Sequence, residues 1–233
     1  MDIEIDKHLD FFESLRQAIV RANRRMNLTR ITEPDEFMRK HVLDSWLPFR
    51  TVQTLRDLSD KGLLVADLGS GAGFPGLVVA RLRPHWEVAL IERTQKKAGF
   101  LEAMRDDLGL GNVYVVPLDA REAAGRVRAL RRGCDLVLAR AVGRLAPVTR
   151  AAAPLLRPGG LLVHYKGGRL EPGELTEGKA AADALRLIQA PPVVYDLPPD
   201  ARRSVILSRA KGRRRGAGPA PRATEENRGD MER

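Results

Sequence analysis

The residues with the clearest chemical potential lie in and just after the segment VADLGSGAGFPGLVVA, residues 65–80. An apolar run leads to Asp67, then to four glycines within eight positions, and then to a second apolar run; the glycines are Gly69, Gly71, Gly73 and Gly76. This order predicts a buried strand, a tight turn and the start of a helix, an arrangement that commonly binds nucleotides. A second acid, Glu92, ends the next predicted strand. We therefore expect a nucleotide-like cofactor at this turn.

Two interpretations of the glycines predict different cofactors. Read as G-x-G-x-x-G, the last three glycines match a dinucleotide site, with Glu92 as the acid that binds ribose. Read as D-x-G-x-G-x-G, Asp67 and the first three glycines match the loop of Rossmann-like methyltransferases. Pro75 has no N–H to offer a pyrophosphate, whereas S-adenosylmethionine carries no phosphate. The sequence favours S-adenosylmethionine, with Glu92 on the ribose hydroxyls and Asp67 positioning the amino-acid end directly or through the loop.

Alternating β-rich and helical runs must hold these residues in place. The expected strands are residues 63–67, 88–92, 113–117, 136–139 and 161–166, and the intervening helices are residues 76–83, 95–108, 121–131 and 145–156. Residues 193–197 and 204–208 flank a PPDAR turn and predict an antiparallel hairpin. We expect an α/β, Rossmann-like class I methyltransferase fold, in which helices cover both faces of a mostly parallel, seven-stranded sheet.

The N-terminal 60 residues predict a helical extension packed on this core. Six apolar residues recur at helical spacing and predict one helix of about 20 residues; they are Ile5, Leu9, Phe12, Leu15, Ile19 and Met26. Pro34 suits a helix's first turn, with Thr32 and Asp35 in cap-like spacing, so a second helix should cover residues 35–46. We place the methyltransferase domain at residues 61–210 and a disordered basic tail at 211–233.

Composition narrows the partner and the compartment. The formal net charge is +10, and +7 without the segment from Lys211, which favours an anionic partner such as nucleic acid. The lone Cys134 cannot form an intramolecular disulfide and is expected in the core, which fits a cytoplasmic protein. No Cys/His cluster has metal-ligand spacing, no apolar run is long enough for a membrane span, and we expect a monomer.

Several separated segments then resemble one family. In order and spacing, NLTRITEPDEFMRKHVLDSW, DLGSGAGFPG, LIERTQKKAGFL, LARAVGRLAPVTRAAAPLLRPGG and HYKGG resemble the RsmG (GidB) family of bacterial 16S ribosomal RNA guanine-N7 methyltransferases. The likeness covers about residues 8–210. Its specific parts are the Phe-Pro after the third glycine and the N-terminal NLT and HVLDS. The LRPGG before an apolar strand is common in Rossmann-like methyltransferases generally, where it reverses the chain after a helix.

The resemblance implies a reaction, a partner and a set of contacts. It implies transfer of the methyl group of S-adenosylmethionine to N7 of a guanine in the decoding-region (530) loop of small-subunit RNA, free or in the 30S particle. It implies cofactor contacts at Gly69, Phe74, Ala120, Arg121 and Arg140. Family members usually carry Glu at the position of Arg121, so a shift to the next residue, Glu122, or a backbone contact remains open.

The residues agree with N7 chemistry by exclusion. The chain has LARAV where an exocyclic-amine methyltransferase usually carries an Asn-Pro-Pro-Tyr-like clamp, and Cys134 lies at the wrong end of its strand for a nucleophile. Guanine N7 has a lone pair and no proton, so we assign no catalytic acid or base. Arg140 is the candidate that orients the guanine or a phosphate; the alternative is a surface arginine paired with a carboxylate.

Further basic residues are candidates for RNA contacts. Arg93, Lys96 and Lys97, with arginines of the first helix, could follow a phosphate backbone, or could form only a solvated face. Lys166, at the end of the fifth strand, is a candidate phosphate contact or a solvated lysine. His41 and Asp44 share one helical face and serve either helix packing or the site.

Three other functions stay open at this point. A methyltransferase with another RNA target would share every motif. A NAD-dependent Rossmann enzyme would use the dinucleotide interpretation. A non-catalytic RNA-binding protein would keep the fold and the basic faces but bind no cofactor.

Overall fold

A computed structural model describes residues 3–58, 62–167, 170–198 and 201–212. The expected disordered tail therefore lies almost wholly outside the described residues. Among the described helices, none has the length and apolar character that crossing a membrane requires. The division of the chain at residues 60 and 210 stays a prediction.

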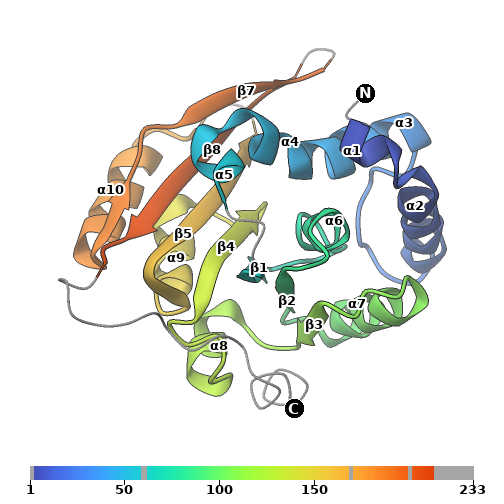
Figure 1. Cartoon of the computed structure of the whole chain (residues 1–233), viewed down its shortest axis with the longest axis horizontal. Coiled ribbons are helices and arrows are strands. Elements are labelled where there is room, and N and C mark those ends of the chain that lie inside the picture. The colour runs from blue at the N-terminus through green and yellow to red at the C-terminus, as the bar shows by residue number, and fades with distance from the viewer. Residues whose placement is uncertain (1–2, 59–61, 168–169, 199–200, 213–233) are drawn as a thin grey trace.

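One sheet organises the molecule (Figure 1). Its strands follow the order β3-β2-β1-β4-β5-β8-β6, and β7 also pairs with β8. The first five are parallel: β1 (Leu64–Leu68), β2 (Glu87–Ile91), β3 (Val113–Val116), β4 (Cys134–Arg140) and β5 (Leu156–Gly167). The last three are β6 (Leu187–Gln189), β7 (Val193–Leu197) and β8 (Ala201–Ala210), and β8 runs antiparallel to its neighbours.

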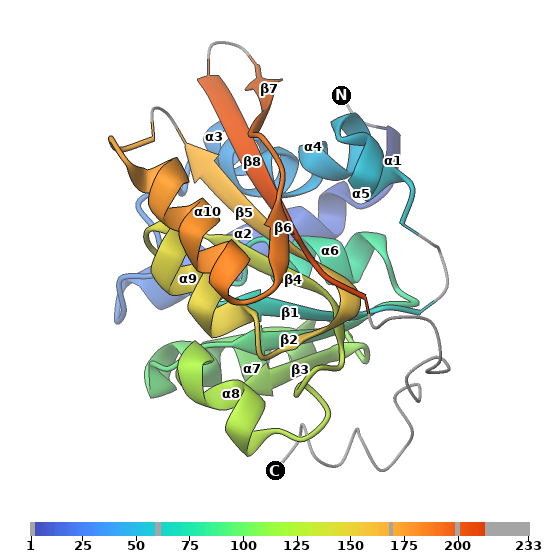
Figure 2. The same cartoon turned by 90° about the vertical axis from the view of Figure 1, so that its left-hand side faces the viewer.

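The outer edge explains why eight strands occupy seven positions in the sheet. Both β6 and β7 pair with the same side of β8, β6 with its end and β7 with its beginning. Pro191 and Pro192 lie between them and have no N–H to donate to a strand ladder. The predicted hairpin of β7 and β8 is confirmed, and Figure 2 shows it rising beside α4 (Asp44–Thr51). Sequence reasoning missed β6.

Helices cover both faces of the sheet. On one face lie α6 (Gly76–Leu82) and α7 (Gln95–Asp107); on the other lie α8 (Ala120–Arg126), α9 (Leu145–Ala152) and α10 (Glu174–Ala184). Successive strand residues alternate between two buried clusters: Val65 and Leu136 join the first, whereas Ala66 and Val137 join the second. Strand residues buried on both sides fit a parallel sheet that is covered on both faces. Helix α10 is a second element that sequence reasoning missed.

The helix before β5 ends earlier than expected. It was expected to run to Leu156 but ends at Ala152. The LRPGG segment belongs to β5 instead, where the pairing with β4 is irregular, and Gly159 has a φ of +83°. The glycines thus shape an irregular strand start, not a helix-ending reversal.

The N-terminal extension packs on the α6 side of the sheet. The expected first helix is divided into two helices, α1 (Ile3–Asp6) and α2 (Leu9–Asn23), because a turn at Lys7 and His8 interrupts it. The second consists of α3 (Pro34–Phe37), a π-helical stretch η1 (Met38–Leu43) and α4, which is followed by α5 (Gln53–Arg56). Pro34 does start α3, but the expected cap is wrong because Glu33 is the N-cap residue and makes no side-chain cap bond.

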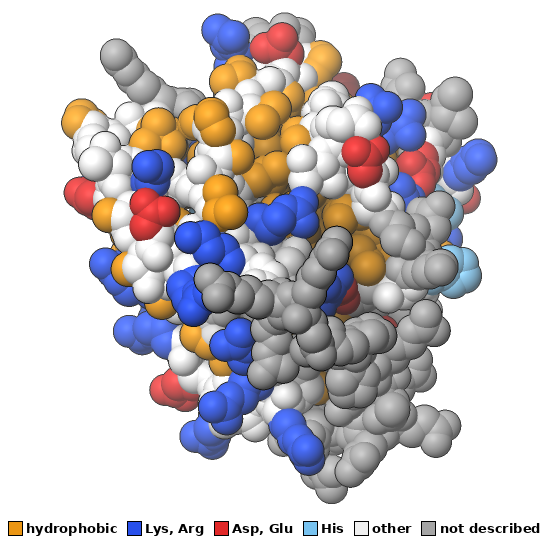
Figure 3. All heavy atoms as spheres, turned by 60° about the vertical axis from the view of Figure 1, so that its left-hand side comes forward, with side chains coloured by type: hydrophobic (Ala, Val, Ile, Leu, Met, Phe, Trp, Pro, Cys, Tyr) orange, Lys and Arg blue, Asp and Glu red, His pale blue; other side chains and the backbone are white. Residues whose placement is uncertain are grey.

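The outer edge of the sheet carries most of the large exposed apolar side chains, which gather on the face that comes forward in Figure 3. They are Leu185, Ile188, Val193 and Val194. Another exposed apolar residue, Val142, lies instead at the end of β4. That end and the end of β1 flank the point where the strand order reverses, and ligands of open α/β sheets bind there.

Candidate functional site

The glycine loop, residues 69–76, joins β1 to α6 and is held by two buried acids. Oδ2 of Asp67 accepts the N–H of Gly76 at 3.0 Å. Oε2 of Glu92 accepts the N–H of Gly71 at 3.0 Å, and its other oxygen accepts the N–H of Thr94 at 2.8 Å. Gly76 has no side chain because there is no room: a Cβ there would lie 2.2 Å from Leu90 Cδ2.

Most backbone amides of this loop donate inside the protein. The N–H groups of Gly69 and Ser70 bond to the carbonyl of Ile91, and those of Leu77 and Val78, at the start of α6, bond to Gly73 and Pro75. With the amides of Gly71 and Gly76 also bound, the loop lacks the free N–H groups that hold a pyrophosphate. The Glu92 carboxylate beside it would also repel an anion. The geometry therefore argues against the dinucleotide interpretation.

Glu92 fits a ribose site in its chemistry. Each oxygen of the carboxylate accepts one backbone N–H and keeps lone pairs for further donors, such as a pair of hydroxyls. The side chain is buried at the carboxyl end of β2, next to Gly71. The glycine loop and Glu92 thus suit a cofactor with a ribose and no phosphate, and their cofactor contacts stay predictions.

Asp67 is a fully buried acid with one orphaned oxygen. Its Oδ1 has no hydrogen-bond partner among the described residues. Burial raises the pKa of Asp67 to about 7, against the lowering effect of the Gly76 N–H. Asp67 therefore holds the loop through Gly76, and its contact with the cofactor, direct or through the loop, stays a prediction.

Arg140, at the carboxyl end of β4, is the centre of a second cluster. Nη1 donates to the carbonyl of Lys40 at 3.1 Å and to Asp44 Oδ2 at 3.3 Å, and Nη2 donates to His41 Nδ1 at 3.0 Å. Its side chain is 14% exposed, so it is not a free surface arginine. These three bonds leave Nε–H and the second N–H of Nη2 without a hydrogen-bond partner in the described part of the chain, so two donors remain for a ligand.

His41 is held neutral in one tautomer. Arginine only donates, so Nδ1 accepts from Arg140, and Nε2–H must then donate to Thr29 Oγ1 at 2.9 Å. Burial, and then the charge of Arg140, lower the pKa of His41 to about 3. The ring stacks on Phe74 of the glycine loop at a centroid distance of 4.4 Å. His41 therefore joins the N-terminal extension to the loop.

Asp44 completes this cluster, which we call the Arg140 network: Thr29, His41, Asp44, Arg140, Tyr195 and Arg203. The Tyr195 hydroxyl donates to Asp44 Oδ1 at 3.1 Å, and Arg203 Nε lies 3.4 Å from the same oxygen. Remote parts of the chain meet here: the N-terminal extension, with Thr29 before α3 and with His41 and Asp44 around the junction of η1 and α4, the end of β4, and the β7–β8 hairpin. A π turn inserted in a helix often marks a functional site. Sequence analysis singled out His41 and Asp44 but missed Thr29, Tyr195 and Arg203.

The end of β3 shows one acid that sequence reasoning missed. Asp119 caps α8 by accepting the N–H of Arg121, and its carboxylate also binds the Arg121 side chain at 2.8 and 2.9 Å. Arg93 lies 3.9 Å away on its other side. The hydrogen bonds from Arg121 hold the pKa of Asp119 at about 2. The signal was an acid shortly after a strand, one residue before the predicted contact at Ala120.

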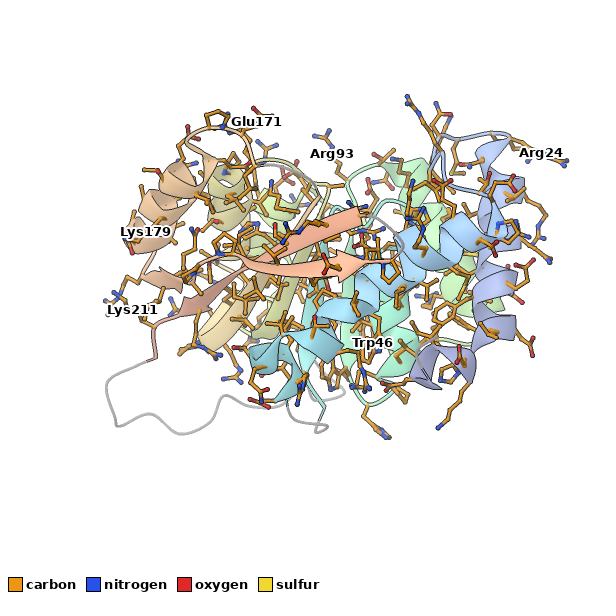
Figure 4. All side chains as sticks on the ribbon, turned by 90° about the horizontal axis from the view of Figure 1, so that it is seen from above. Arg24, Trp46, Arg93, Glu171, Lys179 and Lys211 are labelled. Carbon is orange, nitrogen blue, oxygen red and sulfur yellow. The ribbon has the colours of Figure 1, made fainter. Side chains whose placement is uncertain are left out.

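The predicted RNA contacts differ in their freedom. Arg93 is 74% exposed and points away from the body in Figure 4, and Lys96 is also exposed at the start of α7, whereas Lys97 is half-buried. Lys166 is not solvated: its ammonium donates to Glu174 Oε1 at 2.6 Å and to the carbonyl of Gly143 at 2.7 Å. Because Glu174 already neutralises the Lys166 ammonium, this lysine is poorly suited to bind a phosphate.

The structure also tests the expectations for Cys134 and for a metal site. Cys134 is buried at the start of β4, far along the strand from Arg140, and burial raises the pKa of its thiol, so the predicted core position is confirmed. The described residues contain no cluster of three or more His, Cys, Asp or Glu side chains that could hold a metal ion.

Known proteins resemble this chain along most of its length. The family described as GidB, rRNA small subunit methyltransferase G, matches residues 8–191, which include the extension, the glycine loop and Arg140. Ribosomal RNA small subunit methyltransferase G of Microcystis aeruginosa is 42% identical over 159 residues, 67% of this chain and 69% of the relative. The protein of that name from Lactobacillus johnsonii is 36% identical over 180 residues, 77% of this chain and 73% of the relative.

A solved structure agrees on the fold. A 16S rRNA (adenine(1408)-N(1))-methyltransferase from Catenulisporales acidiphilia matches with a TM-score of 0.55 and 17% identity, over 68% of this chain and 94% of that one. At this identity the likeness concerns the fold alone. The class I methyltransferase fold expected from the sequence is thereby confirmed.

Proposed function

Because the chain belongs to the rRNA small subunit methyltransferase G family, we propose that it transfers a methyl group from S-adenosylmethionine to ribosomal RNA of the small subunit. The acceptor that we propose is N7 of one guanine in the decoding-region loop. The observation that carries the choice of cofactor is the glycine loop, whose amides are bound internally and whose flanks are the acids Asp67 and Glu92.

The residues present fit this cofactor. Glu92 offers acceptor oxygens for the ribose hydroxyls, and the glycine loop offers close approach without a phosphate cradle. The Glu92 carboxylate gives the site a negative potential, which attracts an ammonium and a sulfonium. When bound, S-adenosylmethionine supplies an electrophilic methyl group. We also place Phe74, Ala120 and Arg121 among its contacts, with Asp119 as an additional acceptor at the end of β3.

The protein's own task is to position and not to exchange protons. N7 carries a lone pair and no hydrogen, so the reaction needs no general base, and orientation supplies the main catalytic effect. Arg140 is largely buried, and three partners fix it in place, so its two remaining donors, Nε–H and one Nη2–H, have little freedom. We infer that these donors orient the guanine or its phosphate. The neutral His41 adds no charge and no proton to the site.

The RNA partner agrees with the charge of the molecule. The chain carries a net charge of +10, and Arg93 and Lys96 are exposed near the carboxyl end of β2. Such side chains contact phosphates without reading sequence. Lys166 does not belong to this set because of its ion pair with Glu174. A cytoplasmic location and a monomeric state remain predictions that go with a ribosomal substrate.

Methyl transfer to small-subunit particles tests the proposal. Labelled S-adenosylmethionine, the full chain and 30S particles that lack the modification should yield 7-methylguanosine at one position in the decoding-region loop. Nuclease digestion and mass spectrometry identify the product and its position. Product in another RNA, or at another atom of 16S RNA, would change the substrate and leave the cofactor in place. Binding of NAD in preference to S-adenosylmethionine would overturn the proposal.

A pair of glutamate variants tests the cofactor site separately. In Glu92→Gln, one oxygen becomes an NH₂ group that faces a backbone donor, so the affinity for S-adenosylmethionine should fall at least about tenfold, or about 1.4 kcal/mol. Glu102→Gln makes the same chemical change at an exposed position of α7 and should leave the affinity unchanged. Isothermal titration calorimetry measures both. Equal affinities would remove Glu92 from the cofactor site.

A further inference from the structure

The turn between β4 and α9, residues 141–144, packs against the glycine loop. Val142 is a large apolar side chain that is 40% exposed. A Cβ placed on Gly69 would lie 3.3 Å from both methyl groups of Val142, so the valine rests directly above the first glycine of the loop. Val142 therefore lies where the cofactor loop and the end of β4 meet.

The backbone of this turn has a shape that ordinary residues avoid. Ala141 has a φ of +57°, in the left-handed region, and Gly143 has a φ of +149°. Such conformations are unfavourable for a residue with a side chain and persist where the surroundings impose them. The surroundings of the turn should therefore include groups that hold it.

Lys166 and Glu174 are those groups. The Lys166 ammonium donates to the carbonyl of Gly143 at 2.7 Å and to Glu174 Oε1 at 2.6 Å. The same Glu174 oxygen accepts the N–H of Leu145, the first residue of α9, at 3.0 Å. One buried ion pair thus fixes the turn on both sides of Arg144. Arg140 directly precedes this turn and is held by Lys40, His41 and Asp44.

An apolar wall suits the acceptor chemistry. N7 lies in the plane of the guanine ring, and its lone pair must point at the methyl carbon. A valine that contacts the flat face of the base fixes this plane and leaves the in-plane lone pair free to meet the methyl carbon.

We propose that Val142 contacts the face of the target guanine, and that Lys166 and Glu174 are positioning residues that hold the turn presenting it. This inference rests on the proposed function, since it deepens the assignment of that site. It assigns Lys166 a role in shaping the acceptor site in place of a phosphate contact.

Two valine variants test the contact with the base. Val142→Ala should lower the single-turnover kcat/KM for 30S particles about five- to tenfold, with the Kd of S-adenosylmethionine changed less than twofold. Val194→Ala removes the same atoms from an exposed valine of β7 and should leave both values unchanged. Unchanged kinetics in Val142→Ala, or a parallel loss of cofactor affinity, would overturn the contact. A wild-type protein that forms no 7-methylguanosine would instead refute the proposed function.

Salt dependence separates positioning from phosphate binding at Lys166. Lys166→Met with Glu174→Gln removes both charges together, so that neither is left buried alone. We expect a lower kcat/KM, an effect less than additive with Val142→Ala, and an RNA affinity whose dependence on salt matches wild type. The single variant Lys166→Arg keeps a positive charge beside Glu174 and should therefore retain part of the activity that the double variant loses. If the slope of log K against log salt falls by about one, Lys166 is a phosphate contact and the inference fails.

Discussion

The glycine loop and the Arg140 network lie side by side yet are built in different ways. The loop is held by two carboxyl groups that accept backbone N–H groups. Asp67 accepts from Gly76, 9 positions away, and Glu92 accepts from Gly71, 21 positions away. The network joins side chains across much longer intervals: Arg140 and His41 are 99 positions apart, and Tyr195 and Asp44 are 151 apart. The first is a local device and the second a tertiary one.

The glycine loop and the Arg140 network, the two halves of the site, therefore depend on different parts of the chain. The loop needs only β1, β2 and the start of α6. The network needs the N-terminal extension and the β7–β8 hairpin, so it forms only when remote segments have packed. The two halves meet at Phe74 of the loop, on which His41 stacks and over which the Arg140 guanidinium lies at 5.5 Å from the ring centroid.

Breaking the network at its centre should have the largest effect. Arg140→Met fills similar space but removes a buried partner of Asp44, which should destabilise the fold by about 3–5 kcal/mol and speed amide exchange in the N-terminal extension. Arg144→Met removes an arginine that is half-exposed and paired with Glu177, and it should cost less than about 1 kcal/mol. Denaturant titration and hydrogen exchange measure both. Equal stabilities would refute the tertiary role of Arg140.

Adding a side chain at a tightly packed glycine of the loop should have the next largest effect, and this effect should be confined to the glycine loop. In Gly76→Ala the new Cβ would lie 2.2 Å from Leu90 Cδ2 and 2.8 Å from Asp67 Oδ2, which should cost about 1–3 kcal/mol and weaken S-adenosylmethionine binding. Gly99→Ala, in α7, meets nothing within 4 Å and should stabilise by about 0.5–1 kcal/mol. Calorimetry and denaturation separate the two. Normal cofactor binding by Gly76→Ala would contradict this account.

The two halves should respond to pH with opposite signs. The pKa of Asp67 is raised to about 7, so the folded protein holds this proton longer and its stability falls as pH rises from about 4 to 7. The pKa of His41 is lowered to about 3, so its contribution to stability is lost as pH falls below about 6.5. Each slope reaches at most about 1.4 kcal/mol per pH unit.

Two variants resolve these slopes between pH 4.5 and 6.5. Asp67→Asn should make stability rise more steeply with pH, and His41→Phe, which keeps an aromatic ring on Phe74, should flatten the rise. Equilibrium denaturation at several pH values provides the data. A variant that shifts the curve without changing its slope would show that the residue does not titrate in this range.

The smallest effect should come from the rim of the network. Thr29→Val removes the oxygen that accepts the Nε2–H of His41 and the N–H of Ile31, at a cost of about 1–2 kcal/mol. Thr51→Val removes an exposed hydroxyl that bonds only to the carbonyl of Leu47 and serves as the control. A larger effect of Thr51→Val would mean that the network ends before Thr29.

The sequence predicts what is local and fails where distance in sequence decides. The glycines, Asp67 and Glu92 reveal the loop because strand, turn and helix follow one another directly. Nothing local shows that His41 meets Arg140, because that contact depends on how the extension docks. Lys166 looked like a phosphate contact because α10, which supplies Glu174, was not predicted; its buried face consists of small residues such as Gly178 and Ala181 and gives little apolar periodicity.

The paired prolines between β6 and β7 have a consequence for association between molecules. An unbroken outer strand would present a long row of free N–H and C=O groups, flanked by the exposed side chains of Ile188 and Val194, to any passing chain. Pro191 and Pro192 remove donors at the middle of that row and divide it into two short segments. Edge-to-edge pairing between copies is thereby disfavoured, which protects an apolar edge from aggregation.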